Sequence, residues 1–344
     1  MQCDSILVYV SSGVDDALGE NVIKLPMILA LAEAFPGAKI SWVPGTSGFF
    51  HLERHLAPLV GGRIHEFITD LHVPVEPWQA LRARHPILRR HFDLVIDTQR
   101  YVGRTLFLRR IPHRRFISGT WRYVLSNRFP PRGVPIRPPL LVDKLLGLVA
   151  AAARHPVTVA NPIPVPEPWL RRAAELLPPG PIYVGLAPGV GNMQQGRDWP
   201  FANFLAVAQS QAQRGRVPVM ILGPAERHWE GAVRDAVPTA VIPPLGGDGD
   251  AGQPGGPTLT VALAGQLSAA LANDSGAGHL LAVGGAPMVS LFGWSRPQKR
   301  APFSRALVVI RAQDFGSEAI VDIPVDAVLD AIDRQVEVGP VRSR

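Results

Sequence analysis

Three loops that follow predicted strands carry the side chains best suited to chemistry. The first reads Asn-Asp-Ser-Gly-Ala-Gly-His over residues 273–279 and lies between an apolar run and a predicted helix. Its small residues would let a phosphate approach the backbone N–H groups, while Ser275 and His279 could donate further hydrogen bonds near the positive end of the helix dipole. The alternative is an ordinary helix start that Asp274 or Ser275 only caps.

The second loop contains Pro188-Gly189-Val190-Gly191 and leads to Arg197-Asp198-Trp199-Pro200. A glycine-rich backbone followed by an arginine could clamp a phosphate group. An ordinary loop with a surface arginine would have the same sequence, so both interpretations stay open.

The third loop, residues 11–20, carries Asp15, Asp16 and Glu20 after the first predicted strand. A carboxylate at such a strand end could act as a general base. Acidic residues near a helix start are also common as partners of the helix dipole, which is the simpler interpretation for this loop taken alone.

Alternating strands and helices must position these loops. In the first half, apolar runs at 6–10, 39–43 and 93–97 are typical of buried parallel strands, and residues 21–34 predict a helix. A connector with five prolines follows at 155–168. The pattern then restarts, with strands expected at 182–187, 218–222, 239–242, 269–273 and 287–292 and helices at 201–213, 225–236, 259–265 and from residue 278. This order predicts an α/β protein with two doubly wound domains, residues 1–160 and 161–344.

Taken together and in this order, the three loops resemble glycosyltransferase family 9, the bacterial ADP-heptose:lipopolysaccharide heptosyltransferases. The likeness rests on Gly19-Glu20 with Pro26, on Pro188-Gly189 with residues 197–200, and on the signature from Asn273 to His279 that continues through Gly285, Pro287 and Leu291-Phe292-Gly293. It spans nearly the whole chain and is weakest over residues 60–160. The resemblance implies a GT-B fold, with two Rossmann-like domains facing a cleft, an N-terminal acceptor-binding domain and a C-terminal donor-binding domain.

The resemblance also implies an inverting sugar transfer from a nucleotide-diphospho-sugar and assigns roles to residues. The family's aspartate base aligns with Glu20, which is one methylene longer, and Asp16 or Asp15 could replace it. The family's phosphate-contacting lysine aligns with Arg197, beside an Asp198 that the sequence does not explain. The catalytic residues expected are Glu20, Asp16 and Arg197, and those expected to bind the donor are Gly19, Pro188, Gly189, Arg197, Asp274, Ser275, Gly276 and His279.

Positive charge is concentrated in the first half, where residues 1–160 hold 20 Lys and Arg against 12 Asp and Glu. No acidic residue separates Asp97 from Asp143, a stretch with ten arginines and interleaved aromatic residues. The resemblance implies that this half receives an anionic glycolipid acceptor, with Arg100, Arg104 and Arg122 as contacts. A solvated basic face in an arginine-biased chain is the alternative, and no motif supports nucleic-acid binding. The helix expected over 140–153 would pack on the core or touch a bilayer.

Other features narrow the function classes. One cysteine, Cys3, excludes an intrachain disulfide, and the opening residues show no signal-peptide pattern. No apolar run reaches the ~20 residues of a membrane span. We therefore expect a cytoplasmic monomer, with contact at the inner face of the cytoplasmic membrane left open.

The resemblance also implies that no metal or other cofactor is needed, because in the GT-B fold the helix dipole and basic side chains take the leaving-group charge. Asp248-Gly249-Asp250 spells a metal-binding pattern, but no strand directly precedes it. Two rival functions remain: a non-catalytic relative that binds a nucleotide sugar or an anionic glycan, and a sugar-nucleotide epimerase of the same fold.

Overall fold

The computed structural model describes residues 3–10, 17–45, 50–191, 198–246, 254–295 and 297–339. The chain divides into two compact units, Met1–Val159 and Ala160–Arg344. The expected boundary after residue 160 lies one residue from this division. The site residues Asp15, Asp16 and Arg197, and the acidic pair at 248 and 250, lie outside the described residues.

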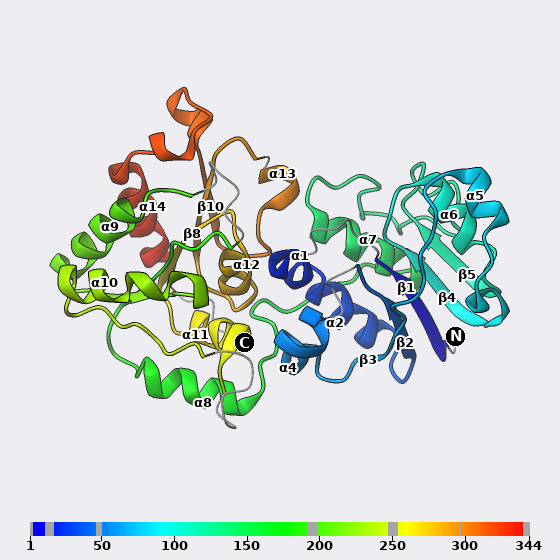
Figure 1. Ribbon diagram of the computed structural model, residues 1–344, viewed down its shortest axis with the longest axis horizontal. Coiled ribbons are helices and arrows are strands. Elements are labelled where there is room, and N and C mark those ends of the chain that lie inside the picture. The colour runs from blue at the N-terminus through cyan, green and yellow to red at the C-terminus, as the bar shows by residue number, and fades with distance from the viewer. Residues whose placement is uncertain are drawn as a thin grey trace. The chain divides into compact units, whose positions relative to one another are not determined.

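The first unit is built on a five-stranded parallel sheet in the order β3-β2-β1-β4-β5 (Figure 1). Its strands are β1 (Ser5–Tyr9), β2 (Lys39–Val43), β3 (Ile64–Phe67), β4 (Phe92–Asp97) and β5 (His113–Ser118). Its helices are α1 (Leu18–Val22), α2 (Leu25–Ala34), the π-helix η1 (His51–His55), α4 (Ala57–Val60), α5 (Pro77–Arg82), the 3-10 helix η2 (Pro86–Arg89), α6 (Val102–Leu108) and α7 (Leu141–Ala153). Strand β1 lies between β2 and β4, which makes the first strand the centre of the sheet.

The second unit repeats this plan with a parallel sheet in the order β10-β9-β8-β6-β7. Its strands are β6 (Tyr183–Ala187), β7 (Val217–Met220), β8 (Ala269–Asn273), β9 (Met288–Phe292) and β10 (Leu307–Arg311). Its helices are α8 (Glu167–Leu176), α9 (Phe201–Gln213), η3 (Pro224–Trp229), α10 (Glu230–Ala236), α11 (Gly256–Ala264), α12 (Gly276–Val283), α13 (Pro297–Arg300), η4 (Ala312–Phe315), η5 (Ile320–Asp322) and α14 (Val325–Val338).

Side chains of β6 alternate between the two faces of this second sheet. Val184 and Leu186 pack with apolar residues of α9, α10 and α14, whereas Tyr183 and Ala187 pack with those of α8, α11 and α12. Figure 1 shows α9 and α14 together on one side of the unit and α8 near α11 on another. Helices therefore cover both faces, as a doubly wound sheet requires.

Prolines account for two departures from the expected elements. The helix expected over 21–34 is divided into α1 and α2, because Pro26 has no N–H to donate to the carbonyl four residues earlier. The strand expected over 239–242 is wrong in extent: only Val241 forms a bridge, to Val219. Pro238 and the Pro243-Pro244 pair flank it, and proline cannot donate to a strand ladder.

The arginine-rich stretch of the first unit forms a helix and a strand that the sequence analysis did not predict. It includes α6 and the edge strand β5. On β5, Arg115 is buried, and its guanidinium carbon lies 5.6 Å from the Phe35 ring centroid. This arginine belongs to the packing of the sheet. The apolar helix α7 buries Val142, Leu145 and most of its following residues, which supports the core alternative for that helix.

Candidate functional site

The loop between β8 and α12 lies at the carboxyl edge of the second sheet, where open α/β sheets bind ligands. Ser275 is the N-cap of α12, and its side chain accepts a hydrogen bond from the Gly278 N–H at 3.4 Å. The capping role that the sequence left open for Ser275 is therefore present. Asp274 is half-buried in the same turn, and Gly276 begins the helix.

Asn273 connects this turn to the second predicted loop. Its side chain is fully buried, donates from Nδ2 to the Pro188 carbonyl at 2.8 Å, and accepts at Oδ1 from the Trp199 N–H at 3.2 Å. The Trp199 indole in turn donates to the Ile323 carbonyl at 2.9 Å. The Asn273 amide thus connects the turn before α12 to the Pro188-Gly189 loop and to Trp199.

Glu226 lies beside the second predicted loop, and the sequence analysis did not single it out. It lies in η3, beyond β7, and its carboxylate occupies the space in front of Gly189 and Gly223. A Cβ added at Gly189 would lie 2.5 Å from Glu226 Oε1. A larger residue at position 189 would collide with the Glu226 carboxylate, which lies against Gly189. This carboxylate places hydrogen-bond acceptors at the edge of the sheet. A glutamate three residues after Gly223, directly beyond an apolar strand, was the available signal.

His279 lies in the first turns of α12 and is only 7% exposed. Burial, with a smaller effect from the positive charge of Arg300, lowers the pKa of His279 to about 4. The imidazole is neutral at pH 7 and can offer one N–H donor, but it supplies no positive charge to a diphosphate.

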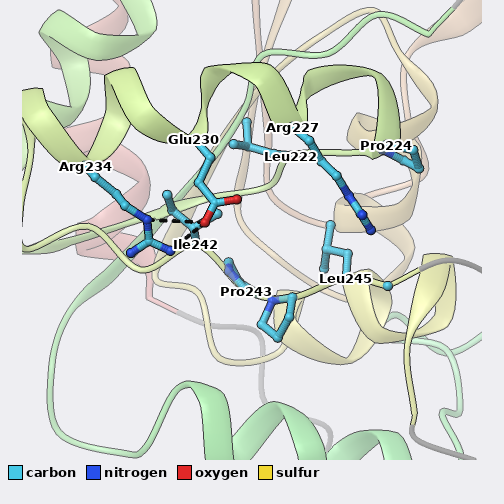
Figure 2. A pocket seen from close by; sticks show the side chains of 10 residues that line it. Leu222, Pro224, Arg227, Glu230, Arg234, Ile242, Pro243 and Leu245 are labelled. Atoms are coloured by element: carbon cyan, nitrogen blue, oxygen red, sulfur yellow. Dashed lines mark hydrogen bonds and ion pairs between the residues drawn. The ribbon is translucent and has the colours of Figure 1, made fainter. Parts of the chain in front are cut away.

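A pocket of about 510 Å³ opens beyond β7 in the second unit (Figure 2). Leu222, Ile242 and Leu245 supply apolar walls, together with prolines 224, 243 and 244. Figure 2 shows Arg227 pointing into the same space from η3. Arg234 and Glu230 also line the pocket, where they form an ion pair at 2.5 Å. Apolar walls with a few polar groups at the rim suit a flat heterocyclic ring.

In the first unit, Glu20 lies in the first turn of α1 and is partly exposed, after a buried Gly19. Two buried polar residues follow that the sequence analysis did not single out. Lys24 is 7% exposed, and its Nζ donates to Oδ1 of the fully buried Asn21 at 3.3 Å. Helix α1 ends at Val22, so Lys24 lies in the turn before α2, four residues after Glu20. The segment that carries the candidate base therefore also carries a buried cation.

A buried acid organises the carboxyl ends of β4 and β5. Asp97 accepts hydrogen bonds from the Thr105 hydroxyl at 2.6 Å, the Ser118 hydroxyl at 2.9 Å and the Gln99 N–H at 2.9 Å. Burial raises the pKa of Asp97 to about 6, although these donors and the charge of Arg104 oppose the rise. The carboxylate holds both strand ends in place, so it fixes the loops that carry the predicted acceptor residues.

The three predicted acceptor arginines lie at this same edge of the first sheet. Arg100 is exposed beyond β4, Arg122 is exposed beyond β5, and Arg104 is half-buried in α6. Arg104 donates to the Gln99 side chain at 3.3 Å. Gln99 also donates from Nε2 to the Val10 carbonyl at 2.9 Å, which connects this edge to the end of the β1 segment.

Two further observations bear on membranes and metals. Within the described ranges, no helix is long and apolar enough to cross a membrane. Over the same ranges, no three His, Cys, Asp or Glu side chains are grouped so that they could hold a metal ion.

Comparison with known proteins identifies the family. The profile of glycosyltransferase family 9 (heptosyltransferase) matches residues 80–322, which is more than half of the chain. The chain belongs to glycosyltransferase family 9. It is therefore a glycosyltransferase, and the resemblance given by the three loops is confirmed.

Relatives within glycosyltransferase family 9 are distant in sequence. The chain is 27% identical to lipopolysaccharide heptosyltransferase 1 of Pseudomonas aeruginosa over 309 residues, which cover 85% of this chain and 80% of that protein. It is 26% identical to lipooligosaccharide heptosyltransferase 2 of Haemophilus influenzae over 244 residues, or 65% and 67% of the two chains.

Solved structures confirm the GT-B fold. A family 9 glycosyltransferase from Veillonella parvula has a TM-score of 0.63 at 17% identity, covering 98% of this chain and 99% of that one. The Escherichia coli heptosyltransferase WaaC with ADP has a TM-score of 0.61 at 17% identity, covering 96% and 99%. The range matched by the family 9 profile contains Gly189, Glu226 and Asn273, whereas Glu20 lies before the first matched residue.

Proposed function

We propose that the protein transfers a heptose from ADP-heptose, with inversion at the anomeric carbon, to an acidic acceptor of the lipopolysaccharide-core type. The family profile and the two curated relatives, both named heptosyltransferases, support this choice of substrates. The observation that carries the proposal is the carboxyl edge of the second sheet, where Asn273 holds the Pro188-Gly189 loop beside the start of α12.

The donor would bind to the second unit through its nucleotide. The pocket walled by Leu222, Ile242 and Leu245 suits the adenine, and the Glu226 carboxylate suits the ribose hydroxyls beside Gly189. The diphosphate would then approach the N-terminal turn of α12, where Ser275, Gly276 and neutral His279 offer N–H and O–H donors. Asp274 would contact the sugar, and Arg197 would pair with the phosphates.

The transfer needs a proton acceptor at the acceptor hydroxyl. In our proposal the hydroxyl oxygen attacks the anomeric carbon, the bond from that carbon to the diphosphate breaks, and Glu20 takes the hydroxyl proton. The departing ADP carries the new negative charge, which the α12 dipole and basic side chains would stabilise without a metal.

The acceptor would bind to the arginines of the first unit, and we propose a cytoplasmic monomer that contacts the inner membrane surface peripherally. Phosphate and carboxylate groups of the acceptor match the guanidinium groups of Arg100, Arg104 and Arg122. Anionic lipid near the same arginines would add about 1 kcal/mol for each basic residue close to the surface.

Turnover tests this proposal directly. Purified protein is mixed with ADP-heptose and a deacylated lipopolysaccharide-core acceptor, and ADP release is measured with and without EDTA. We expect acceptor-dependent ADP release that EDTA leaves unchanged and that Glu20→Gln lowers at least about 100-fold. Turnover of Glu20→Gln at the wild-type rate would refute the role of Glu20, and loss of activity in EDTA would refute metal-independent transfer.

The extra methylene of Glu20 favours a second candidate, a non-catalytic binder of nucleotide sugars. A displacement of ~1 Å can cost two orders of magnitude in rate, so Glu20 would support binding without transfer. ADP-heptose binding by calorimetry without ADP release, together with activity restored by Glu20→Asp, would establish this candidate. Absence of any nucleotide-sugar binding would eliminate both candidates.

A further inference from the structure

Three consecutive residues beyond β5 adopt the left-handed backbone conformation. Trp121, Arg122 and Tyr123 have φ angles of 49°, 58° and 69°, and none of them is glycine. For a residue with a side chain this region is less stable than the right-handed one, because the Cβ atom lies too close to the following carbonyl oxygen. Such a turn persists only where its surroundings fix it, and backbone strain of this kind gathers at binding sites.

Hydrogen bonds to the outer edge of β5 fix the end of this turn. Ser126 donates its hydroxyl to the Ser118 carbonyl at 2.7 Å and accepts from the Ser118 N–H at 2.6 Å. Asn127 donates its N–H to the Phe116 carbonyl at 2.8 Å and accepts from the Phe116 N–H at 2.5 Å. The segment after the turn therefore satisfies backbone groups at the outer edge of β5, where no further strand pairs.

Tyr123, the last of these three residues, packs against α7. Its side chain is 3% exposed, and a Cβ added at Gly147 of α7 would lie 3.3 Å from the Tyr123 hydroxyl. With Tyr123 directed inward against α7, the preceding two side chains are left outside. Trp121 is 61% exposed and Arg122 is exposed as well.

The loop beyond β4 brings further side chains to the same edge. A Cβ added at Gly119 would lie 3.8 Å from Arg100 Nε, so Arg100 lies against the chain just before the turn. The neighbouring Tyr101 is 52% exposed, and the Arg104 guanidinium carbon lies 5.0 Å from its ring centroid. We call Arg100, Tyr101, Arg104, Trp121 and Arg122 the aromatic–arginine face.

We propose that Trp121 stacks on a sugar ring of the acceptor while Arg100 and Arg122 bind an anionic group on the same saccharide. This inference rests on the proposed function and adds a specificity-determining residue to it. An indole ring offers a rigid apolar surface to the C–H face of a sugar at a low cost in conformational entropy. A guanidinium binds phosphate or carboxylate through two parallel hydrogen bonds. The face therefore fits an acidic saccharide better than a neutral one.

Exposed tryptophan and arginine also occur where proteins meet a membrane surface. The position of the face favours the saccharide. It lies at the carboxyl ends of two parallel strands, where open α/β sheets bind small ligands.

Binding to a soluble oligosaccharide separates these possibilities. The probe is the phosphorylated oligosaccharide that remains after alkaline deacylation of lipopolysaccharide, because it has the sugars and phosphates without acyl chains. Full-length wild type, Trp121→Ala and Trp121→Phe are titrated with this probe, with ADP, and with phosphatidylglycerol vesicles. Trp78→Ala is the matched control, since Trp78 is 58% exposed on α5.

We expect Trp121→Ala to weaken oligosaccharide binding roughly tenfold, a loss of about 1.4 kcal/mol, with ADP affinity unchanged. Trp121→Phe should stay within about threefold of wild type because it keeps an aromatic ring. Trp78→Ala should bind all three probes as wild type does.

Three results would overturn the inference. Trp121→Ala could bind the oligosaccharide as wild type does, or lose only vesicle binding, which would assign Trp121 to the membrane. Wild type could also bind ADP but not the oligosaccharide, which would reject the face as a saccharide site while leaving donor binding intact. Failure to bind ADP would instead count against the proposed function itself.

Discussion

Replacement of Asp97 by Asn should remove a pH-dependent loss of stability from the first unit. Asp97 is fully buried, and its carboxylate accepts hydrogen bonds from Thr105, Ser118 and the Gln99 backbone. An asparagine keeps one oxygen for the Gln99 N–H. Its amide group would face the Thr105 and Ser118 hydroxyls, which can rotate to accept. The substitution therefore removes the charge while the network stays satisfied.

The magnitude follows from the pKa of Asp97, which burial raises from 3.8 to about 6. The folded protein binds the proton more tightly than the unfolded chain, so the free energy of unfolding falls as pH rises between these two values. A difference of about two pKa units corresponds to about 3 kcal/mol. That stability is present below pH ~4 and is lost above pH ~6, in wild type but not in Asp97→Asn.

Urea denaturation between pH 4.5 and 7.5 measures the difference. The free energy of unfolding of Asp97→Asn minus that of wild type should rise with pH and level off above about 6.5. Asp93→Asn is the control on the same strand, because hydrogen bonds from Asp4, Arg114 and Ser5 lower the pKa of Asp93. Its difference from wild type should stay nearly constant in this range. A flat difference for Asp97→Asn would refute the account of its burial.

Three further outcomes are expected. Gly189→Ala should weaken ADP binding at least about tenfold, because the added Cβ would displace the Glu226 carboxylate. Gly231→Ala should leave ADP affinity unchanged, because the space around Gly231 is open. Equal affinities of the two variants would contradict the Glu226 contact. The imidazole of His279 should stay neutral down to about pH 5 in an NMR titration, since burial lowers its pKa to about 4, and a midpoint near 6.5 would show that it is not buried. Arg122→Gly should raise the free energy of unfolding by about 1 kcal/mol relative to Arg122→Ala in urea denaturation, because glycine accepts the left-handed conformation; no gain would count against strain there.

Much of the fold was predictable from the sequence, because the central strands of a parallel sheet are buried on both faces and form apolar runs. Strand β4 reads Phe-Asp-Leu-Val-Ile-Asp, and its buried run is visible without any partner. Strand β5 reads His-Arg-Arg-Phe-Ile-Ser, and its two arginines conceal it within a basic stretch. Only the second half of this edge strand, Phe-Ile-Ser, contains apolar residues. Composition alone therefore could not distinguish β5 from a surface segment.

The candidate site was predictable where small residues follow a strand, as at Pro188-Gly189 and at Ser275-Gly276. Lys24 was not, because nothing local distinguishes it from a surface charge, and the position of Glu226 three residues after Gly223 was its only local signal. Their roles depend on burial and on a glycine across the sheet edge. Only the packed structure shows those surroundings.

The Asn273 amide also limits how the donor specificity of this enzyme could be exchanged. It joins backbone groups 85 and 74 residues away, at Pro188 and Trp199. A loop grafted alone from another transferase would lose its partner at this amide and leave a buried polar group unsatisfied. Successful chimaeras should therefore carry all three segments together, and recombination that separates them should yield poorly folded protein.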